Sequence, residues 1–503
     1  MSTFANTDAL YVNKNVVSYA QLQSMSNFVS NLLDERLEQD ESRVAILSQR
    51  ELLAYVAIVA CILTDKTYVP LNTKAPLERL VSMLVTANVK TIIVSEQYKE
   101  LAEEIKTRLP YICLLVIDEE TLHNSPLKKT NNQNNLSLQA NSLAYDCDKS
   151  PQEISNGISY IMFTSGSTGK PKGVPIFESN LLTYFDFVIP YCGLSTADRA
   201  SQTFDLTFDL SVHDLFVTWL SGACLYVLPN SALFSPAAFI KEHELTAWFS
   251  VPSTGAIMQK FGLLKEGAYP SLKLSLFCGE ALSTNMAKAW QKSAPNSKLI
   301  NFYGPTEATI ACAYFEVPWN FHNENVIPIG KPFPHMNFTT IANEELLITG
   351  PQVTTGYLDA TETMNANFES VVNNGNSTTC YHSGDKVTQL ESGDFVYHGR
   401  LDEQVKIQGY RVELSEIEAV VKELLHNNLV KVVVWPNDIS SFNKAVYLFI
   451  QGDKEAEVEQ RLVNHLKRNL PHYMQPKKIN WIESMPLNLN GKIDRNALRA
   501  MLG

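Results

Sequence analysis

The chain has 503 residues, and its 53 Asp and Glu against 41 Lys and Arg give a formal net charge of −12. This acidic balance argues against a non-specific nucleic-acid binder, because phosphate contacts need a basic face. With 45% hydrophobic and 19% charged residues, the composition is typical of a globular protein and not of a disordered or collagen-like chain. Since single cores stop growing at roughly 250 to 300 residues, the length predicts two or more domains.

The sequence carries no visible targeting or membrane signal. Its first residues lack both the basic and the apolar region of a secretory signal. The longest apolar run, residues 52–63, is too short to cross a bilayer of about 30 Å and predicts a buried helix. We therefore expect a cytoplasmic protein without membrane insertion. The 8 cysteines are scattered without zinc-type spacing, which predicts free thiols.

The first third of the chain alternates short β-branched runs with amphipathic stretches. Residues 43–47, 91–94 and 114–117 have the composition of buried strands, and residues 77–87 have the pattern of an amphipathic helix. This alternation predicts βαβ units and a largely parallel sheet. The Asn- and Gln-rich stretch 125–150 is typical of a surface loop.

The pattern changes toward the C-terminus. A polar patch at residues 373–379 predicts a hairpin or loop insertion. Beyond Asp402, residues 414–425 predict an amphipathic helix, and residues 430–435 and 445–450 predict strands. These elements indicate a small α+β domain that begins near Asp402.

The most informative segment is an apolar strand at residues 160–163 followed by Thr164-Ser-Gly-Ser-Thr-Gly-Lys-Pro-Lys-Gly173. Its glycines allow tight turns with exposed N–H groups, and its hydroxyls and lysines add donors and charge suited to phosphate oxygens. The residues expected at the phosphates are Ser165, Gly166, Ser167, Thr168, Gly169 and Lys172. The glycine and lysine spacing is not that of a Walker A loop. A flexible linker fits poorly, because linkers seldom follow an apolar strand directly.

Further motifs run from the middle of the chain almost to its end. They are Phe208-Asp-Leu-Ser211, Phe277-Cys-Gly-Glu-Ala281, Asn301-Phe-Tyr-Gly-Pro-Thr-Glu-Ala-Thr309, Tyr381-His-Ser-Gly-Asp385, Gly399-Arg-Leu-Asp-Glu-Gln-Val-Lys-Ile-Gln-Gly-Tyr-Arg-Val-Glu413 and Asn488-Leu-Asn-Gly-Lys-Ile-Asp-Arg495. Together with the loop, this set resembles the amino-acid-activating branch of the adenylate-forming (ANL) superfamily. The resemblance implies an α/β fold: a large N-terminal domain of layered sheets and helices, residues 1–401, and a small mobile α+β domain, residues 402–503.

The resemblance also implies a reaction. A substrate carboxylate attacks the α-phosphorus of ATP, and pyrophosphate leaves. Because two anions must approach one another, positive charge and a metal are needed where negative charge accumulates. Glu307 would hold Mg²⁺, Thr168 and Lys492 would complete the catalytic set, Tyr303 would stack on adenine, and Asp385 would hold the ribose. The ATP- and AMP-binding residues implied are Thr164, Ser165, Gly166, Ser167, Thr168, Gly169, Lys172, Gly279, Glu280, Asn301, Tyr303, Gly304, Thr306, Asp385, Arg400 and Lys492.

Two half-reactions at one site imply two poses of the small domain. By resemblance, Asp402 is the hinge; Lys492 faces the site in the adenylating pose, and the region of Gly409 faces it in the thioester-forming pose. Hinges of this kind absorb large backbone rotations at a few residues. His213 and His382 are not needed as general bases, because a carboxylate is already ionised at neutral pH. We expect them to be structural or to line a pocket.

Asp209 indicates the substrate class. In the amino-acid-activating branch an aspartate at this position holds the substrate α-ammonium. A buried carboxylate without a partner is costly, so a cationic substrate group is expected opposite it. By resemblance the remaining pocket residues are Leu210, His213, Thr254, Leu276, Cys278, Phe302, Ile310 and Ala311.

The pocket composition predicts a very small substrate. A phenyl ring at Phe302, with His213 nearby, should fill the space that a substrate side chain needs, which points to glycine or alanine. The sequences around Cys278 and after Tyr303 look like those of D-alanine:carrier-protein ligases, which have a smaller residue where this chain has Phe302. A similar enzyme is the glycine:carrier-protein ligase of lipid A modification, so we favour glycine.

The acyl acceptor is expected to be a separate protein. Only 503 − 492 = 11 residues follow Lys492, which leaves no room for a carrier domain. We expect transfer in trans to the phosphopantetheine thiol of a carrier protein. The alternatives are a D-alanine:carrier-protein ligase, an acyl-CoA synthetase indifferent to Asp209, and an inactive nucleotide-binding scaffold. Intact Thr168, Glu307, Asp385 and Lys492 argue against the last.

Overall fold

The computed structural model describes residues 4–38, 41–124, 157–166, 170–233, 236–322, 325–341, 343–373, 376–426, 428–439, 441, 444–488 and 492–502. The polar stretch at 125–150, predicted as a surface loop, therefore lies outside the described residues. Within these ranges, no helix has both the length and the apolar character that a membrane-spanning segment requires.

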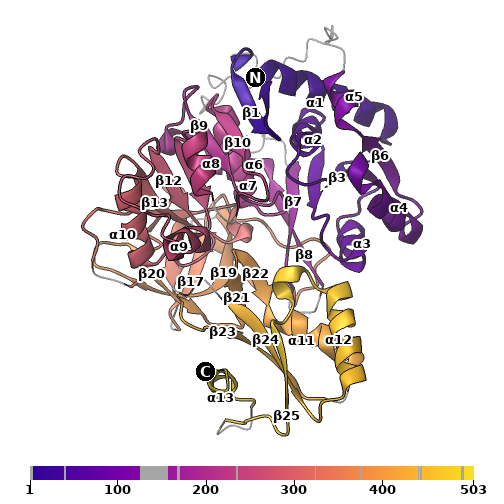
Figure 1. Ribbon diagram of the computed structural model, residues 1–503, viewed down its shortest axis with the longest axis vertical. Helices are drawn as coiled ribbons and strands as arrows, with labels where there is room; N and C mark the ends of the chain where they lie inside the picture. Colours follow the sequence, from indigo (N-terminus) through magenta and orange to yellow (C-terminus); the bar gives the residue numbers. More distant parts are fainter. Residues whose placement is uncertain are drawn as a thin grey trace.

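One sheet is built from the first third of the chain, drawn in indigo to magenta in Figure 1. Its strand order is β6-β5-β3-β4-β7-β8, and neighbours pair parallel except in the β7–β8 hairpin. The strands are β3 (Arg43–Leu47), β4 (Thr67–Leu71), β5 (Thr91–Ser95), β6 (Cys113–Ile117), β7 (Ile158–Thr164) and β8 (Lys172–Phe177). The predicted strands and the largely parallel pairing are thus confirmed.

The accompanying helices follow from their apolar patterns. They are α1 (Tyr19–Arg36), α2 (Leu52–Leu63), α3 (Leu77–Thr86), α4 (Lys99–Arg108) and α5 (Glu119–His123), with a 3₁₀ turn η2 (Glu96–Tyr98). Helix α2 is apolar all round and is buried over nearly its whole length, as a helix without a polar face must be. The predicted helices at 52–63 and 77–87 are both present.

A second, longer sheet has the order β15-β14-β13-β12-β11-β9-β10-β1-β2. Its strands are β1 (Asp8–Val12), β2 (Asn15–Ser18), β9 (Arg199–Gln202), β10 (Cys224–Val227), β11 (Ala247–Ser250), β12 (Leu274–Phe277), β13 (Lys298–Tyr303), β14 (Ala313–Glu316) and β15 (Lys331–Pro332). The interior pairs are parallel, and the pairs at both edges are antiparallel.

The helices of this second region are α6 (Glu178–Cys192), α7 (Leu210–Leu220), α8 (Ala237–Glu242), α9 (Pro252–Lys260) and α10 (Thr284–Ser293), with a 3₁₀ turn η4 (Thr306–Ala308). One large hydrophobic cluster packs side chains from both sheets together. Two of its aromatic members, Phe249 of β11 and Phe302 of β13, pack against one another, so the core connects these two strands of the candidate site.

An antiparallel sheet follows, with order β16-β17-β19-β18 and β20 paired to β19. Its strands are β16 (Asn337–Thr340), β17 (Glu345–Thr349), β18 (Phe368–Asn373), β19 (Asn376–Gln389) and β20 (Phe395–Arg400). Asn373 pairs with Asn376, so the polar patch at 373–379 belongs to a hairpin, as predicted. The parallel βαβ pattern did not predict this antiparallel region.

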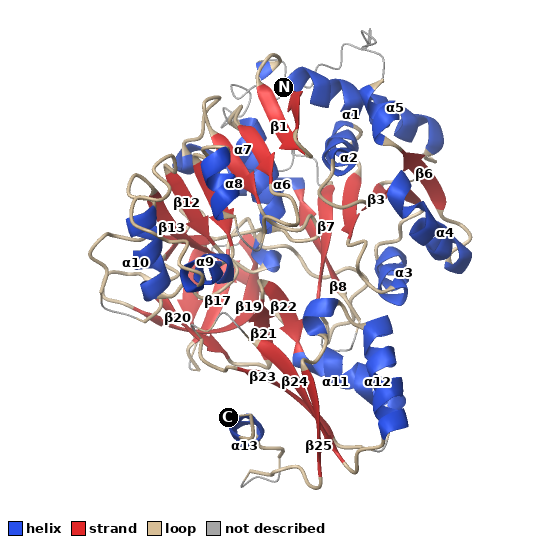
Figure 2. Cartoon of the chain, viewed as in Figure 1, coloured by secondary structure: helices blue, strands red, loops and turns tan. Residues whose placement is uncertain are grey.

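The C-terminal residues form their own layers. The hairpin β21 (Gln404–Ile407) and β22 (Tyr410–Glu413) precedes α11 (Leu414–Leu424), and a sheet of order β23-β24-β25 follows. Its further elements are β23 (Val430–Trp435), β24 (Ala445–Gln451), α12 (Ala456–Asn469), η5 (His472–Met474), β25 (Lys478–Ile482) and α13 (Arg495–Ala500). Figure 2 shows α11 and α12 beside these strands, with α12 near α3. A separate hydrophobic cluster fills this part.

Candidate active site

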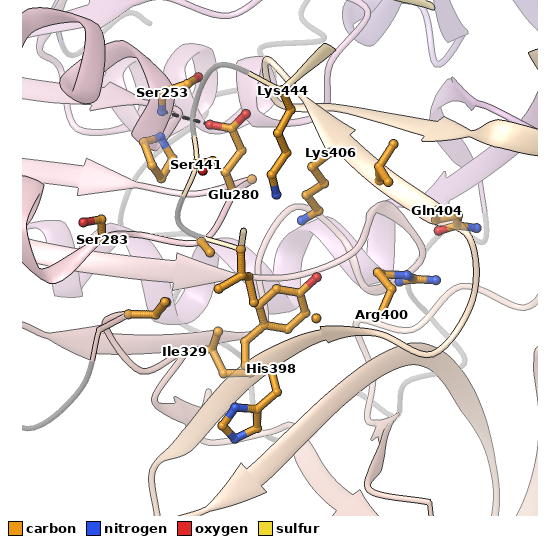
Figure 3. Close-up of a pocket in the computed structure, with 18 of the residues that line it drawn as sticks. Ser253, Glu280, Ser283, Ile329, His398, Arg400, Gln404, Lys406, Ser441 and Lys444 are labelled. Carbon is orange, nitrogen blue, oxygen red and sulfur yellow. Dashed lines mark hydrogen bonds between the residues drawn. The ribbon is translucent and has the colours of Figure 1, made fainter. Parts of the chain in front are cut away.

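The main cavity, of about 450 Å³, lies between the second sheet, the antiparallel sheet and the C-terminal residues (Figure 3). Strands β12 and β13 deliver part of its lining, because Gly279 and Glu280 follow β12, Tyr303 ends β13, and Gly304 follows it. Ligands of open α/β sheets bind at the carboxyl ends of the strands, so this position is typical of a binding site. A Cβ on Gly304 would lie 2.5 Å from the Cα of Ala311, so only glycine fits there.

A charged network holds one wall of the cavity. Arg400 Nη1 donates to Asp385 Oδ1 at 2.9 Å and to the Ser383 carbonyl at 2.7 Å. The Tyr303 hydroxyl donates to the other oxygen of Asp385. Arg400 also binds Asp402; burial opposes ionisation of Asp402, but this partner holds its pKa below the usual value. The expected ribose and adenine residues are therefore brought together by the chain's own hydrogen bonds.

Asn301 has an unused polar atom in the same cavity. Its Nδ2 donates to the Pro328 carbonyl at 2.8 Å, which fixes the orientation of the amide. Its Oδ1 is buried and has no hydrogen-bond partner among the described residues. A buried acceptor of this kind costs free energy until a donor arrives. The exocyclic amino group of adenine has that chemistry.

A second cavity of about 50 Å³ adjoins the first, and residues such as Gly279, Gly304 and Arg400 line both. Asp209, at the start of α7, lies in it with 6% of its surface exposed. Burial raises the pKa of its carboxyl to about 6, although a hydrogen bond with Thr306 lowers it. The chain thus holds a buried carboxylate at a cavity that has room for only a few atoms.

The predicted amino-acid pocket divides into two groups. Leu210, Cys278 and Ile310 line the small cavity with Asp209. The others do not line it: His213, Thr254, Leu276, Phe302 and Ala311. The Phe302 ring lies in a cluster of aromatic rings, 6.1 Å from His213 and 6.4 Å from Phe249, and it borders the main cavity.

No motif predicted Tyr184, which contacts His213, one of the predicted pocket residues. Its hydroxyl bonds to His213 Nδ1 at 2.7 Å, and both side chains are buried. Burial lowers the pKa of His213 to about 3, so the imidazole is neutral at pH 7. His213 therefore brings no positive charge to the neighbourhood of Asp209. His382 lies away from both cavities and faces Glu345 and Glu369.

Glu307, in η4, is fully buried and tightly paired. Arg411 Nη1 donates to its two carboxylate oxygens at 2.9 and 2.8 Å, and the Tyr357 hydroxyl donates to it at 2.6 Å. Burial opposes ionisation of Glu307, but the Arg411 charge holds its pKa below the usual value. The Lys172 ammonium lies 4.9 Å from the centre of the Tyr357 ring, in the same corner. In the sequence, Arg411 is part of the motif from Gly399 to Glu413, and we predicted no role for it.

Glu307 fits a magnesium ion held mainly by substrate. Among the described residues, no group of three or more His, Cys, Asp or Glu is arranged to hold a metal. Mg²⁺ characteristically binds one or two carboxylates and completes its shell with phosphates and water. One buried carboxylate beside a phosphate loop has the donor chemistry for that type of site.

The phosphate loop is described in part. Thr164 ends β7, and Ser165 Oγ donates to the Arg411 carbonyl at 2.7 Å. The Gly166 N–H donates to Glu416 Oε2 at 3.2 Å. Ser167, Thr168 and Gly169 lie outside the described residues, so the expectation for Thr168 stays a prediction.

The C-terminal part presents Gly409, and not Lys492, to the site. The Gly409 N–H donates to Glu280 Oε1 at 2.7 Å, and its positive φ of 83° suits glycine. A Cβ there would lie 2.6 Å from Val251 Cγ1. Lys492 is exposed and lines neither cavity. This is the arrangement expected for the thioester-forming pose.

Two lysines of the C-terminal part border the cavity without having been predicted. Lys406, on β21, lines both cavities, and Lys444 lines the larger one; Figure 3 shows both with Glu280 and its hydrogen bond to Ser253. Burial lowers the pKa of Lys444, while Glu280 opposes that shift. Lys406 belongs to a motif named in the sequence analysis. A charged residue between apolar strand residues was the signal that could have identified it as a site residue.

Comparisons with known proteins agree with this geometry. Residues 2–358 match the family described as AMP-binding enzyme. The D-alanine–D-alanyl carrier protein ligase of Staphylococcus epidermidis is 31% identical, covering 96% of this chain and 93% of that protein. Tyrocidine synthase 1 of Brevibacillus parabrevis is 28% identical, covering 98% of this chain and 44% of that protein.

A solved structure extends the match to the whole fold. The Vibrio cholerae adenylation domain AlmE, in complex with glycyl-adenosine-5'-phosphate, is 31% identical and superposes with a TM-score of 0.83. The match covers 100% of this chain and 95% of that one. The chain therefore belongs to the AMP-binding enzyme family, within the adenylate-forming superfamily, and is an AMP-forming ligase.

Proposed function

We propose that the protein activates a very small amino acid, glycine before alanine, and passes it to a carrier protein. In the first step a carboxylate oxygen bonds to the α-phosphorus of ATP, the bond to the β-phosphate oxygen breaks, and pyrophosphate leaves. In the second step the phosphopantetheine thiol of a separate carrier protein loses its proton and bonds to the acyl carbon, and AMP leaves.

The observation that carries this proposal is Asp209 in the small cavity. Its carboxyl forms no ion pair within the described part of the chain, and burial raises its pKa. A substrate ammonium group would restore the charge balance and hold the substrate carboxylate toward the larger cavity. Fatty or aryl acids offer no such cation, so Asp209 argues against an acyl-CoA synthetase.

The larger cavity suits the nucleotide. The free Oδ1 of Asn301 would accept from the adenine amino group, and Tyr303 would offer its ring face. Asp385 and Arg400 would take the ribose, and the loop that begins at Ser165 would take the phosphates. Glu307 would hold Mg²⁺, which when bound neutralises phosphate charge.

The two half-reactions would use two arrangements of the C-terminal part. We propose residues 1–401 and 402–503 as the two domains, with Asp402 as the hinge. Among the residues that the structure describes, the hydrogen-bond partners of the Asp402 side chain are the nearby Arg400 and the Gln404 N–H, so Asp402 can turn without unpacking a core. Rotation there would exchange Gly409 for Lys492 at the site, and Lys492 would then stabilise the reacting oxygens.

Glycine is favoured because the small cavity has little room beyond Asp209. Leu210, Cys278 and Ile310 line it, and Phe302 and His213 fill the core nearby. AlmE was crystallised with glycyl-adenosine-5'-phosphate, and the resemblance to the glycine ligase of lipid A modification extends the proposal to the cell envelope. D-alanine is the second candidate, since the ligase of S. epidermidis named for it is 31% identical.

The test is amino-acid-dependent exchange between ATP and labelled pyrophosphate. The panel comprises glycine, both alanine enantiomers, serine, proline and a fatty acid, with Asp209→Asn as the matched control. A signal with glycine that the control lacks supports the proposal. Preference for D-alanine would assign the teichoic-acid type of ligase. A signal with the fatty acid that survives Asp209→Asn would overturn the proposal.

A further inference from the structure

The loop after η4 has an uncommon backbone conformation at the wall of the small cavity. Thr309 and Ile310 both have positive φ values, 57° and 70°. β-branched residues rarely adopt this left-handed region, because their side chains collide with the backbone. Ile310 lines the small cavity with Asp209, whereas Thr309 is fully buried and does not line it. This wall of the cavity is therefore built on a backbone that needs support from outside the loop.

The side chain of Gln352 supplies that support. Its Nε2 donates to the carbonyls of Ala311, Ala308 and Thr309 at 2.8, 3.2 and 3.3 Å. A side-chain amide has two N–H bonds, so one of them is shared between two carbonyls. In return, the Thr309 hydroxyl donates to the backbone carbonyl of Gln352 at 2.6 Å. One glutamine thus holds the backbone on both sides of Ile310.

Gln352 is itself fixed to the large core. It lies between β17 and β18, has no exposed surface and lines neither cavity. The preceding Pro351 carbonyl accepts from Asn180 Nδ2 of α6 at 2.7 Å. Two residues after Gln352, the Thr354 hydroxyl donates to the Pro175 carbonyl of β8 at 2.5 Å. Because the chain is anchored on both sides of Gln352, its amide has a defined position from which to hold the loop.

We propose that Gln352 is a positioning residue that holds Ile310 in the wall of the small cavity and thereby limits the size of the amino acid accepted. The inference rests on the proposed function, because a size limit needs an amino-acid substrate. Without the amide, the buried carbonyls of Ala308 and Ala311 lose this donor, which is costly. The loop then leaves the left-handed conformation, the Ile310 side chain moves, and the wall opens.

The first test measures amino-acid-dependent exchange between ATP and labelled pyrophosphate. Gln352→Met keeps the length of the side chain but removes its donors. The KM for glycine and the ratio of kcat/KM with serine to kcat/KM with glycine should each rise about tenfold, while the KM for ATP stays within about twofold. A role in folding alone would reduce the amount of active protein, which lowers the apparent kcat and changes neither KM nor the ratio.

Gln291→Met is the matched control. Gln291 lies in α10, is also buried, and donates through Nε2 to the Val317 carbonyl at 2.8 Å. The control therefore removes the same amide from a buried carbonyl. Gln291 lines neither cavity, and its neighbour Trp290 packs in a different hydrophobic cluster from Ile310. The KM for glycine and the serine-to-glycine ratio should stay within about twofold of wild type.

A double-mutant cycle tests whether Gln352 acts through Ile310. Ile310→Ala alone should raise the serine-to-glycine ratio about tenfold, because it removes the same part of the wall. Adding Gln352→Met to Ile310→Ala should then change the ratio by less than about twofold, since the side chain that Gln352 holds is already gone. A further tenfold rise in the double variant would overturn the inference, because independent effects multiply.

The methyl signal of Ile310 reads the loop without an assay of activity. In protein labelled at the isoleucine δ1-methyl groups, this NMR signal is assigned by its absence from Ile310→Ala. Its chemical shift should change in Gln352→Met and stay unchanged in Gln291→Met. Gln352→Asn keeps the amide but shortens its reach, and should change the signal and the ratio in the same direction. This milder variant decides the question if Gln352→Met does not fold.

Three results would overturn the inference: an unchanged Ile310 signal in the Gln352 variants, an unchanged KM and ratio in them, or equal changes in Gln291→Met. Absence of exchange by wild type with every amino acid would instead contradict the proposed function. The Ile310 signal would then still decide whether Gln352 holds the loop, so the two failures are distinguishable.

Discussion

Glu307 and Asp209 are both buried carboxylates of the candidate site, yet the molecule treats them differently. Arg411 covers both oxygens of Glu307 and keeps its pKa low. Asp209 forms no ion pair with any described residue, and burial raises its pKa to about 6. Lys406 lines the same small cavity and offsets only part of that shift. The difference separates a charge that the chain balances itself from one that it leaves for a substrate.

From this comparison we infer that the two regions differ in mobility. The partner of Glu307 comes from the C-terminal part, so it can be exchanged by a rotation. One side of the small cavity around Asp209 comes from α7, β12 and the turn after Tyr303, which are anchored in the large core, and the other side comes from C-terminal residues such as Lys406 and Gly409. We infer that the phosphate corner and this second side change between the half-reactions, while the side built from the large core stays fixed.

We expect the largest effect on activity from Lys492, which lies near neither Glu307 nor Asp209 in this structure. Lys492→Ala should lower amino-acid-dependent pyrophosphate exchange by about 1,000-fold, because one preorganised charge on the reacting oxygens is lost. Thioester formation from supplied aminoacyl-adenylate should change by less than about threefold. The exposed Lys467 offers a control, since Lys467→Ala removes a lysine of the same part. Equal loss of both half-reactions would contradict the use of two arrangements.

Asp209→Asn tests the second half of the comparison. Removing one member of a buried charge pair between protein and substrate should lower kcat/KM for glycine by about 300-fold. The KM for ATP should change little, because the nucleotide contacts are made by other residues. Steady-state exchange kinetics with each substrate varied in turn would measure both. A similar fall in both parameters would mean that the substitution damages the whole site.

The pH dependence should distinguish the two carboxylates. Because the pKa of Asp209 is about 6, kcat/KM for glycine should fall about tenfold from pH 7 to pH 5 as the carboxylate gains a proton. The Asp209→Asn variant should lack this step. Glu307, whose pKa is lowered, should add no step in that range. A profile measured at saturating ATP and subsaturating glycine tests this.

The same pKa makes a prediction about stability. The folded pKa of Asp209 lies above the unfolded value of about 3.9, so the unfolded chain ionises more readily. Stability is therefore lost as pH rises from about 4 to 6. At pH 7, the free energy of unfolding of Asp209→Asn should be about 3 kcal/mol higher than that of wild type. This difference should disappear below pH 4. Urea titrations at both pH values would measure it.

The smallest effect concerns selectivity. Phe302→Ala should raise the ratio of activity with serine to activity with glycine by about tenfold, because removing the ring opens space near the small cavity. Phe239→Ala, which removes the same ring from a different hydrophobic cluster, should leave the ratio unchanged. Exchange assays with both amino acids would measure the ratio. Unchanged selectivity in Phe302→Ala would show that the ring does not limit substrate size.

Local pattern predicted much of the fold. The helix at 52–63 and the strand at 43–47 have the predicted bounds, because polar residues flank each apolar run. The hairpin around Asn373 also followed from its turn residues. The antiparallel sheet was missed, since β17 and β19 pair across a long separation that periodicity does not encode.

The site was predictable where motifs follow strands. Asn301, Tyr303 and Glu280 meet at one cavity because their strands end on the same edge of a sheet. Arg411 could not be assigned from sequence, since its role depends on where the C-terminal part rests. Tyr184 belongs to no motif named in the sequence analysis, and only its hydrogen bond with His213 connects it with the site. The two-domain division and the residue roles stay predictions.

The N-terminal strand has a consequence for synthesis. Leu10 of β1 pairs with Leu225 of β10, and the Tyr19 hydroxyl binds the Ala223 carbonyl at 2.7 Å. At about 5 to 20 residues per second, the ribosome needs roughly 10 to 40 s after making β1 before its partner emerges. During that time β1 can pair only with β2, and its other edge lacks the partner that β10 provides. Deleting residues 8–18 would also leave β10 as an unprotected edge, so production trials should preserve this segment.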